Sequence, residues 1–195
     1  MTETDKITFM PFRGEAEKYS FQDSYIAQLY RRVVRDGTVT NVFYDGSIQN
    51  TNDFLDFFKN KNNEIYVLFY EEREAGFFWL NNFRQRTSFV TYCIFKDFWG
   101  KKALEIVQNG ISQILNRKNE FDEYITDVLL CLTPVNNKWV IQFLTKAGLT
   151  TLCKIPKCIA LHGREVQDGV LFHISREGDS GLKGFTSKFL NILQK

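Results

Sequence analysis

The chain has 195 residues, of which 44% are hydrophobic and 25% charged, a composition that excludes a disordered or fibrous protein and suits one globular domain. Its 25 lysines and arginines nearly balance 23 aspartates and glutamates, so the charge does not indicate a nucleic-acid or membrane surface, and any anion site must be local. Four cysteines lack the CxxC spacing and the nearby histidine pair of a zinc site, so we expect reduced thiols and no metal: Cys93, Cys131, Cys153 and Cys158.

The two ends of the chain differ in character. The start, MTETDKITF, lacks the apolar core of a signal peptide, and no apolar run approaches a membrane-spanning length. We therefore expect a cytoplasmic protein, of bacterial or phage origin, without nucleic-acid or membrane partners. After a domain spanning residues 1–177, segment 178–195 comprises a Gly/Ser linker and an apolar stretch, 185–193. This tail is expected to dock as a short helix on the domain, on a second copy or on an assembly partner.

Hydrophobic periodicity in the first half of the chain predicts two helices and several strands. One helix begins near Ser20 and ends near Gly37, and another begins at Thr51 or Asn52. Two apolar runs flank the charged segment 71–74, as in an antiparallel hairpin. Residues 87–95 are bulky on both faces, as in a central strand. The predicted strands of this half are 7–12, 39–44, 65–70, 76–80 and 87–95.

Two strand–helix units follow. In the first, strand 87–95 runs through a charged turn into a helix; in the second, strand 124–132 is connected by Thr133-Pro134 to helix 137–147, which ends at Gly148. Two last strands, 150–155 and 170–175, are separated by a loop with Pro156, Gly163 and Gly169. Antiparallel strands followed by strand–helix alternation predict an α+β domain with a mixed, mostly antiparallel sheet flanked by helices.

The turn Trp99-Gly100-Lys101-Lys102 in the first unit is a candidate anion site. A helix leaves its first amide groups unpaired, and their partial positive charge attracts phosphate. Gly100 has no Cβ and so lets the backbone approach a ligand closely. The alternative is that Gly100 makes a plain strand-to-helix turn and the lysines are solvated, because short motifs often match by accident.

Together the two units resemble, from about residue 5 to residue 176, the core of the GNAT superfamily of acyl-CoA-dependent N-acetyltransferases. The triplet Tyr92-Cys93-Ile94 takes the place of a family triplet whose backbone pairs with the pantetheine arm of coenzyme A. The resemblance implies a binding segment made of this triplet and of the turn that follows it, namely Trp99, Gly100, Lys101, Lys102, Ala103 and Leu104.

The turn also departs from the family pattern Arg/Gln-x-x-Gly-x-Gly/Ala. Trp99 replaces Arg/Gln, as in the branch resembling ribosomal-protein acetyltransferases, while Lys102 and Leu104 occupy the positions of the two small residues. These two large side chains could obstruct the cofactor, or Lys101 and Lys102 could contact phosphate as cations.

The second unit resembles the closing segment of the family, in which an Asn contacts the cofactor arm. Asn137 matches this Asn, and capping the helix is its alternative role. The aromatic residue that often protonates the departing thiolate is replaced by Leu144. A general base is also required, because the amine must lose a proton. None of the following candidates is assigned: Tyr66, Glu71, Glu72, Glu74, Tyr92, His162 and His173.

Two functions from different classes remain. The first is an N-acetyltransferase that transfers an acetyl group from acetyl-CoA to an unidentified amine. The second is a catalytically inactive GNAT-like binding or assembly module, for example in a phage particle, which Lys102, Leu104 and Leu144 favour. Both imply that strands 87–95 and 124–132 are adjacent and parallel and splay apart near Phe95.

Overall fold

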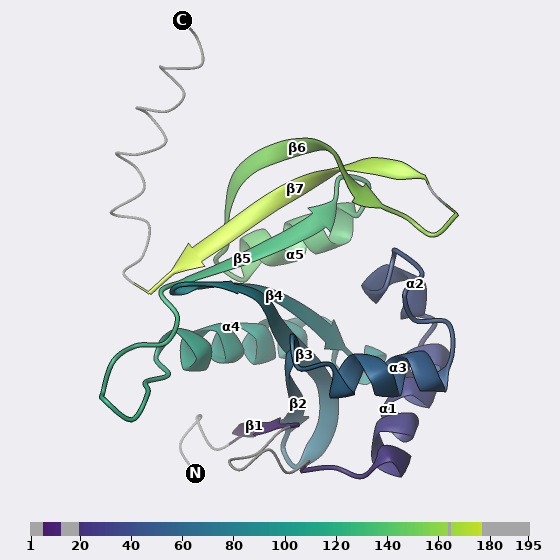
Figure 1. The fold of residues 1–195 in the computed structure, drawn as a ribbon, viewed down its shortest axis with the longest axis horizontal. Helices are drawn as coiled ribbons and strands as arrows, with labels where there is room; N and C mark the ends of the chain where they lie inside the picture. Colours follow the sequence, from purple (N-terminus) through teal and green to yellow (C-terminus); the bar gives the residue numbers. More distant parts are fainter. Residues whose placement is uncertain (1–5, 13–19, 164, 177–195) are drawn as a thin grey trace, which may run out of the picture.

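The structure, a computed structural model, describes residues 6–12, 20–163 and 165–176. These residues form a seven-stranded sheet with the order β1-β2-β3-β4-β5-β7-β6, with helices packed on both faces (Figure 1). The strands are β1 (Ile7–Pro11), β2 (Glu64–Tyr70), β3 (Arg73–Arg84), β4 (Thr87–Ile94), β5 (Val128–Pro134), β6 (Thr150–Ala160) and β7 (Val166–Ser175). The helices are α1 (Asp23–Arg35), α2 (Val39–Val42), α3 (Thr51–Lys59), α4 (Lys101–Leu115) and α5 (Lys138–Lys146), with a short 3₁₀ turn, η3 (Lys96–Phe98), before α4.

The core is rich in aromatic residues because β3 presents rings to both faces of the sheet. Phe77 packs against Phe54 and Phe58 of α3, each with ring centroids 5.5 Å apart. Phe78 points to the opposite face and stacks on Tyr66 at 4.7 Å. A sheet that buries apolar side chains on both faces needs helices on both, which is why the predicted α+β arrangement forms.

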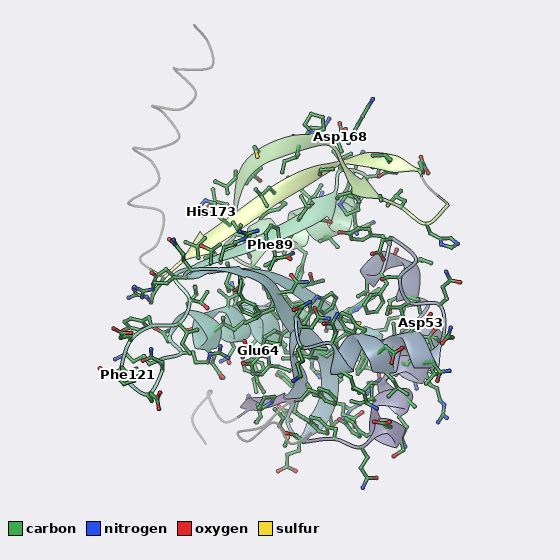
Figure 2. All side chains as sticks on the ribbon, in the orientation of Figure 1. Asp53, Glu64, Phe89, Phe121, Asp168 and His173 are labelled. Atoms are coloured by element: carbon green, nitrogen blue, oxygen red, sulfur yellow. The ribbon has the colours of Figure 1, made fainter. Side chains whose placement is uncertain are left out.

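The strands β4 and β5 are adjacent and parallel, as predicted. They pair at only three positions, Thr87 with Val128, Ser88 with Leu129 and Phe89 with Leu130. Beyond these pairs β4 stays bonded to β3 as far as Ile94, and β5 to β7 as far as Pro134. The two strands therefore separate immediately after Phe89, labelled in Figure 2, and not near Phe95 as the sequence predicted.

The predicted short strand at 39–44 is wrong, because most of this segment forms the helix α2. The amide groups of Val42 and Phe43 donate to the carbonyls of Thr38 and Val39, which are local helical bonds. The helix expected to begin near Ser20 begins at Asp23, after Gln22 as its N-cap residue.

The last strands differ from the prediction in length. β5 begins at Val128 and includes Thr133 and Pro134, which the sequence had placed in the connection to the next helix. Pro156 and Gly169 lie within β6 and β7 and not in a loop. Pro156 is tolerated because β6 is the edge strand and its pairing with β7 is interrupted between Ile155 and Ile159.

The predicted linker and docking helix of the tail lie outside the described residues. Across the ranges that the structure describes, the helices are too short or too polar to cross a bilayer.

Candidate functional site

The free edge of β4 forms one side of the opening between β4 and β5. The amide of Phe95 bonds to the carbonyl of Ala75 in β3 at 2.9 Å. Because backbone groups alternate between the two sides of a strand, the backbone of Cys93 also faces β3, and those of Tyr92 and Ile94 face the opening. The predicted triplet therefore presents two of its three residues to the opening.

The side chains of the triplet are not part of this edge. Burial, with a smaller effect from Asp36, raises the pKa of the Cys93 thiol. Burial also raises the pKa of Tyr92, whose hydroxyl lies so close to α4 that a Cβ at Gly110 would approach it to 3.0 Å. Both groups stay neutral at physiological pH, and we assign neither a chemical role.

Trp99 lies across the end of the β4 edge. Its indole Nε1 donates to the carbonyl of Ile94 at 2.8 Å, while Lys96 Nζ lies 5.6 Å from the centre of its ring. The side chain is still 52% exposed. A bound ligand could therefore pair with Tyr92 and with the amide of Ile94, but it would have to displace Trp99 to reach the Ile94 carbonyl.

The start of α4 lies directly after this edge and has no cap of its own. Gly100 occupies the N-cap position with φ 82° and ψ −132°, no side chain accepts from the first amides, and the first turn contains no acidic residue. Leu104 N already bonds to the Gly100 carbonyl at 3.3 Å, so the amides without an acceptor inside the helix are those of Lys101, Lys102 and Ala103. No atom lies within 4 Å of the place where a Gly100 Cβ would lie. The backbone here is open to an external anion.

The two large side chains that depart from the family pattern do not fill this approach. Lys102 Nζ lies 5.3 Å from the ring centre of Tyr70 and 5.8 Å from that of Phe98, so the side chain extends toward β2 and away from β5. Leu104 packs against the core, and Ala103 is buried. Lys101 and Lys102 are both exposed, but the Lys102 ammonium lies over the two rings, so Lys101 is the cation at the helix start that is not drawn toward them.

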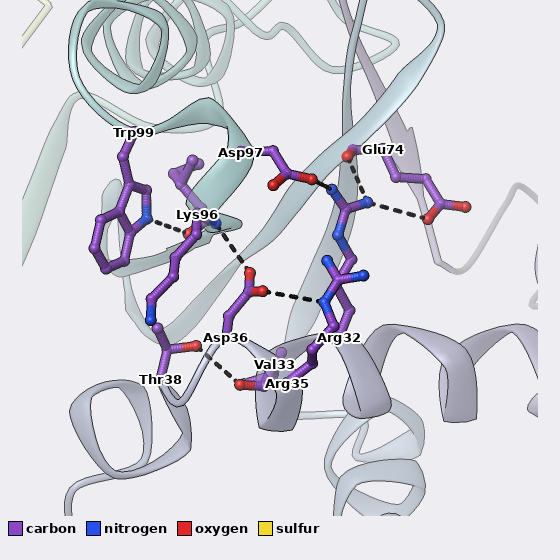
Figure 3. A network of polar contacts seen from close by, with 10 residues as sticks. Arg32, Val33, Arg35, Asp36, Thr38, Glu74, Lys96, Asp97 and Trp99 are labelled. Carbon is purple, nitrogen blue, oxygen red and sulfur yellow. Dashed lines mark hydrogen bonds and ion pairs between the residues drawn. The ribbon is translucent and has the colours of Figure 1, made fainter.

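A polar network from α1, which the sequence did not predict, holds the turn in place (Figure 3). Arg32 donates to Asp97 at 2.9 Å and to the carbonyl of Glu74 at 3.0 Å. The buried carboxylate of Asp36 accepts from the amide of Lys96 at 2.9 Å. The only sequence signal was a charged residue, Asp36, placed immediately before the helix-ending Gly37.

The start of α5 forms the other side of the opening. Asn137 caps the helix, its Oδ1 accepting from Val140 N at 3.3 Å, and the first turn again has no acidic residue. This bond confirms the capping role of Asn137 without testing the cofactor contact. Leu144 is buried, so its position supplies no proton donor.

The tip of the β6–β7 hairpin closes over the loop that follows α2. His162 N donates to the Tyr44 carbonyl at 2.8 Å, and the imidazole of His162 packs against Gly46. Burial, with smaller effects from Asp45, Cys131 and Cys158, raises the pKa of Tyr44. Burial also raises the pKa of the Cys131 thiol in β5 to about 12. Tyr44 and Cys131 therefore stay neutral at physiological pH.

Of the remaining candidates for a catalytic base, Glu71 and Glu72 are exposed in the turn between β2 and β3, and the others lie elsewhere in the fold. Tyr66 bonds to Glu64 and Arg117 at the far end of α4, and Glu74 pairs with Arg32. His173 is buried within β7 (Figure 2). The catalytic residues thus stay unassigned.

Comparison with known proteins places this geometry in a fold class. No family model and no curated protein matches the sequence, but solved structures match the fold. The microcin C7 self-immunity acetyltransferase MccE, solved with acetyl-CoA and AMP, has 18% identity and a TM-score of 0.64, with 88% of this chain and 93% of that chain covered.

Two further structures give the same result. An acetyltransferase from Salmonella typhimurium that modifies the N-terminal serine of ribosomal protein L7/L12 has 10% identity and a TM-score of 0.68, with 87% of this chain and 95% of that chain covered. A GNAT-family acetyltransferase from Bacillus anthracis has 16% identity and a TM-score of 0.66, with coverages of 88% and 96%. The protein has the GNAT fold, as the sequence resemblance predicted.

Proposed function

We propose that this protein binds acetyl-CoA in the opening between β4 and β5 and transfers the acetyl group to an amine. The observation that supports this most directly is the parallel pair β4–β5, which separates after three residue pairs beside an α4 start with neither cap nor acidic residue. MccE, which has the same fold, is described in complex with acetyl-CoA.

The residues of the opening suit the parts of this ligand. The diphosphate is an anion, and the amides of Lys101, Lys102 and Ala103 offer it three donors at a positive helix end, with Lys101 as a nearby cation. The pantetheine arm contains amide groups, which can add to the free edge at Tyr92 and Ile94 as an extra strand would. The acyl group would then lie within the separation of the two strands.

The buried Leu144 does not prevent the transfer. A neutral amine attacking the thioester displaces a thiolate, and an ordinary thiol has a pKa near 8.5, so the thiolate is a moderate leaving group at neutral pH. The attacking nitrogen loses one proton as the amide forms, and water can carry that proton to the departed thiolate. The enzyme would act mainly by holding thioester and amine in contact, without a protein acid at position 144.

Calorimetric titration and thermal unfolding with CoA and acetyl-CoA test the proposal. Ligand at about one hundred times its Kd stabilises the folded state by about 2.7 kcal/mol, which for a domain of this size raises Tm by about 5–10 °C. Absence of binding at millimolar ligand would refute the proposal. Binding without release of CoA in the presence of a panel of amines would favour the inactive binding module instead.

A further inference from the structure

Trp139 is the most exposed large hydrophobic side chain among the described residues, at 84%. It lies in the first turn of α5, next to the exposed Lys138. Burying an aromatic ring is strongly favourable, so a ligand that covered Trp139 would gain binding energy from this contact.

The helix geometry shows which way Trp139 faces. Residues four apart lie on one side of a helix, so Trp139, Phe143 and Ala147 form a stripe. Ala147 lines a cavity of about 290 Å³ together with Gln108 and Ile111 of α4. The stripe therefore faces α4, and Trp139 lies on the α4 side of α5.

The stripe becomes more exposed toward the start of α5. Solvent exposure increases along it, from buried Ala147 through half-buried Phe143 to exposed Trp139. Gln108 Nε2 donates to the carbonyl of Lys146 at 3.4 Å, and these two residues lie at similar distances from the starts of their helices. Because α4 and α5 follow the parallel strands β4 and β5, both helices start at the same end of the sheet, and Trp139 and the amides that follow Gly100 share that end.

The charge at the starts of α4 and α5 suits an anion with a planar base. Neither α4 nor α5 has an acidic residue in its first turn, and Lys101 and Lys138 are exposed there. The nucleotide end of CoA combines three phosphate groups with an adenine ring. A tryptophan beside a cationic, anion-binding helix start offers such a ligand both an electrostatic and a stacking contact.

We propose that Trp139 is the stacking platform for the adenine ring of acyl-CoA. The proposal rests on the proposed function, because it requires CoA to bind with its diphosphate at the start of α4. It adds to that function a residue that recognises the nucleotide end and distinguishes CoA from shorter pantetheine thiols.

The experiment compares the affinities of CoA and 4′-phosphopantetheine for the full chain by calorimetry. Trp139→Ala should weaken CoA binding about tenfold, the usual size of a base–aromatic contact, and leave phosphopantetheine binding unchanged. Trp139→Phe keeps a ring and should retain most of the CoA affinity. Phe121→Ala removes an equally isolated ring, 76% exposed, and serves as the matched control with unchanged CoA affinity.

Three results would overturn the proposal. Equal losses for CoA and phosphopantetheine in Trp139→Ala would indicate a general structural effect. An unchanged CoA affinity together with a change in oligomeric state, measured by sedimentation, would assign Trp139 to a protein contact. Wild type that binds phosphopantetheine as tightly as CoA would refute the platform but keep the proposed function, whereas failure to bind either ligand would remove both.

Discussion

The helices on the two faces of the sheet begin differently. α1 and α3 have an acidic residue in the first turn, Asp23 and Asp53. In α3 the Asn50 side chain also accepts from the amides of Asn52 and Asp53. α4 and α5 have no acid in the first turn, and α4 has no side-chain cap. A carboxylate at a helix start neutralises its partial positive charge. α1 and α3 therefore carry an acid that repels an external anion. α4 is open to a ligand anion, and α5, although Asn137 caps it, has no acid to repel one.

The strands beneath these helices also differ, in how far neighbouring strands are paired. On the amino-terminal side, β2, β3 and β4 pair along most of their length, and aromatic rings fill the space up to α3. β4 and β5 pair at only three positions. The open helix starts lie at the end where these strands have separated, so backbone donors and free strand edge meet in one place.

The largest effect is expected from Gly100→Val. At φ 82° and ψ −132° a β-branched residue is strongly disfavoured, so the turn must change and take the amides of Lys101, Lys102 and Ala103 out of position. We expect CoA affinity to fall more than about a hundredfold, since the diphosphate contact depends on these amides. Calorimetric titration measures the loss, and circular dichroism checks that the domain is folded.

Gly163→Val is the matched control for this change. Gly163 has φ 87° and, like Gly100, no atom within 4 Å of its Cβ position, but it lies at the β6–β7 turn. It should cost similar stability and leave CoA affinity nearly unchanged. Equal losses of affinity in both variants would mean that backbone strain and not the anion site is responsible.

A smaller effect is expected from Lys101→Glu, which gives α4 the acidic first turn that α1 and α3 have. The carboxylate should stabilise the helix start by about 0.3–1 kcal/mol while repelling phosphate, so CoA affinity should fall about tenfold as the free energy of unfolding stays level or rises. Titration and urea unfolding measure the two quantities.

Two variants on α1 and α3 complete this comparison. Arg31→Glu makes the same charge change on the exposed surface of α1 and should leave CoA affinity within about twofold. Asp53→Asn removes the acid of α3, which accepts from Gln49 N at 2.9 Å, and should lower stability without changing CoA affinity. A gain of stability without a loss of affinity in Lys101→Glu would show that phosphate does not bind at the start of α4.

Periodicity was enough to predict most of the fold. The apolar runs around residues 71–74 predicted the β2–β3 hairpin, and the two strand–helix units predicted the adjacent parallel pair β4–β5. It failed at 39–44, where β-branched composition favoured a strand but local bonds from Val42 and Phe43 made a helix. Composition there competes with contacts that are set by the tertiary fold.

The site was predicted in position more than in detail. Gly100 and Asn137 were found at the two helix starts because turn and cap residues have local causes. The Lys102 side chain is turned toward Tyr70 and Phe98. This direction depends on tertiary packing, so the sequence alone could not show whether Lys102 obstructs the cofactor. The sequence also could not predict two hydrogen bonds of the folded turn, from Trp99 Nε1 to the Ile94 carbonyl and from the Lys96 amide to Asp36.

The most direct test is to follow backbone amide chemical shifts of isotope-labelled protein during a titration with CoA. We expect the chemical shifts of five amides to change with one saturation curve, namely those of Lys101, Lys102, Ala103, Tyr92 and Ile94. The chemical shifts of amides at the starts of α1 and α3 should not change. Shifts at the starts of α1 or α3 with none after Gly100, or no shifts at saturating CoA, would contradict a phosphate site at the start of α4.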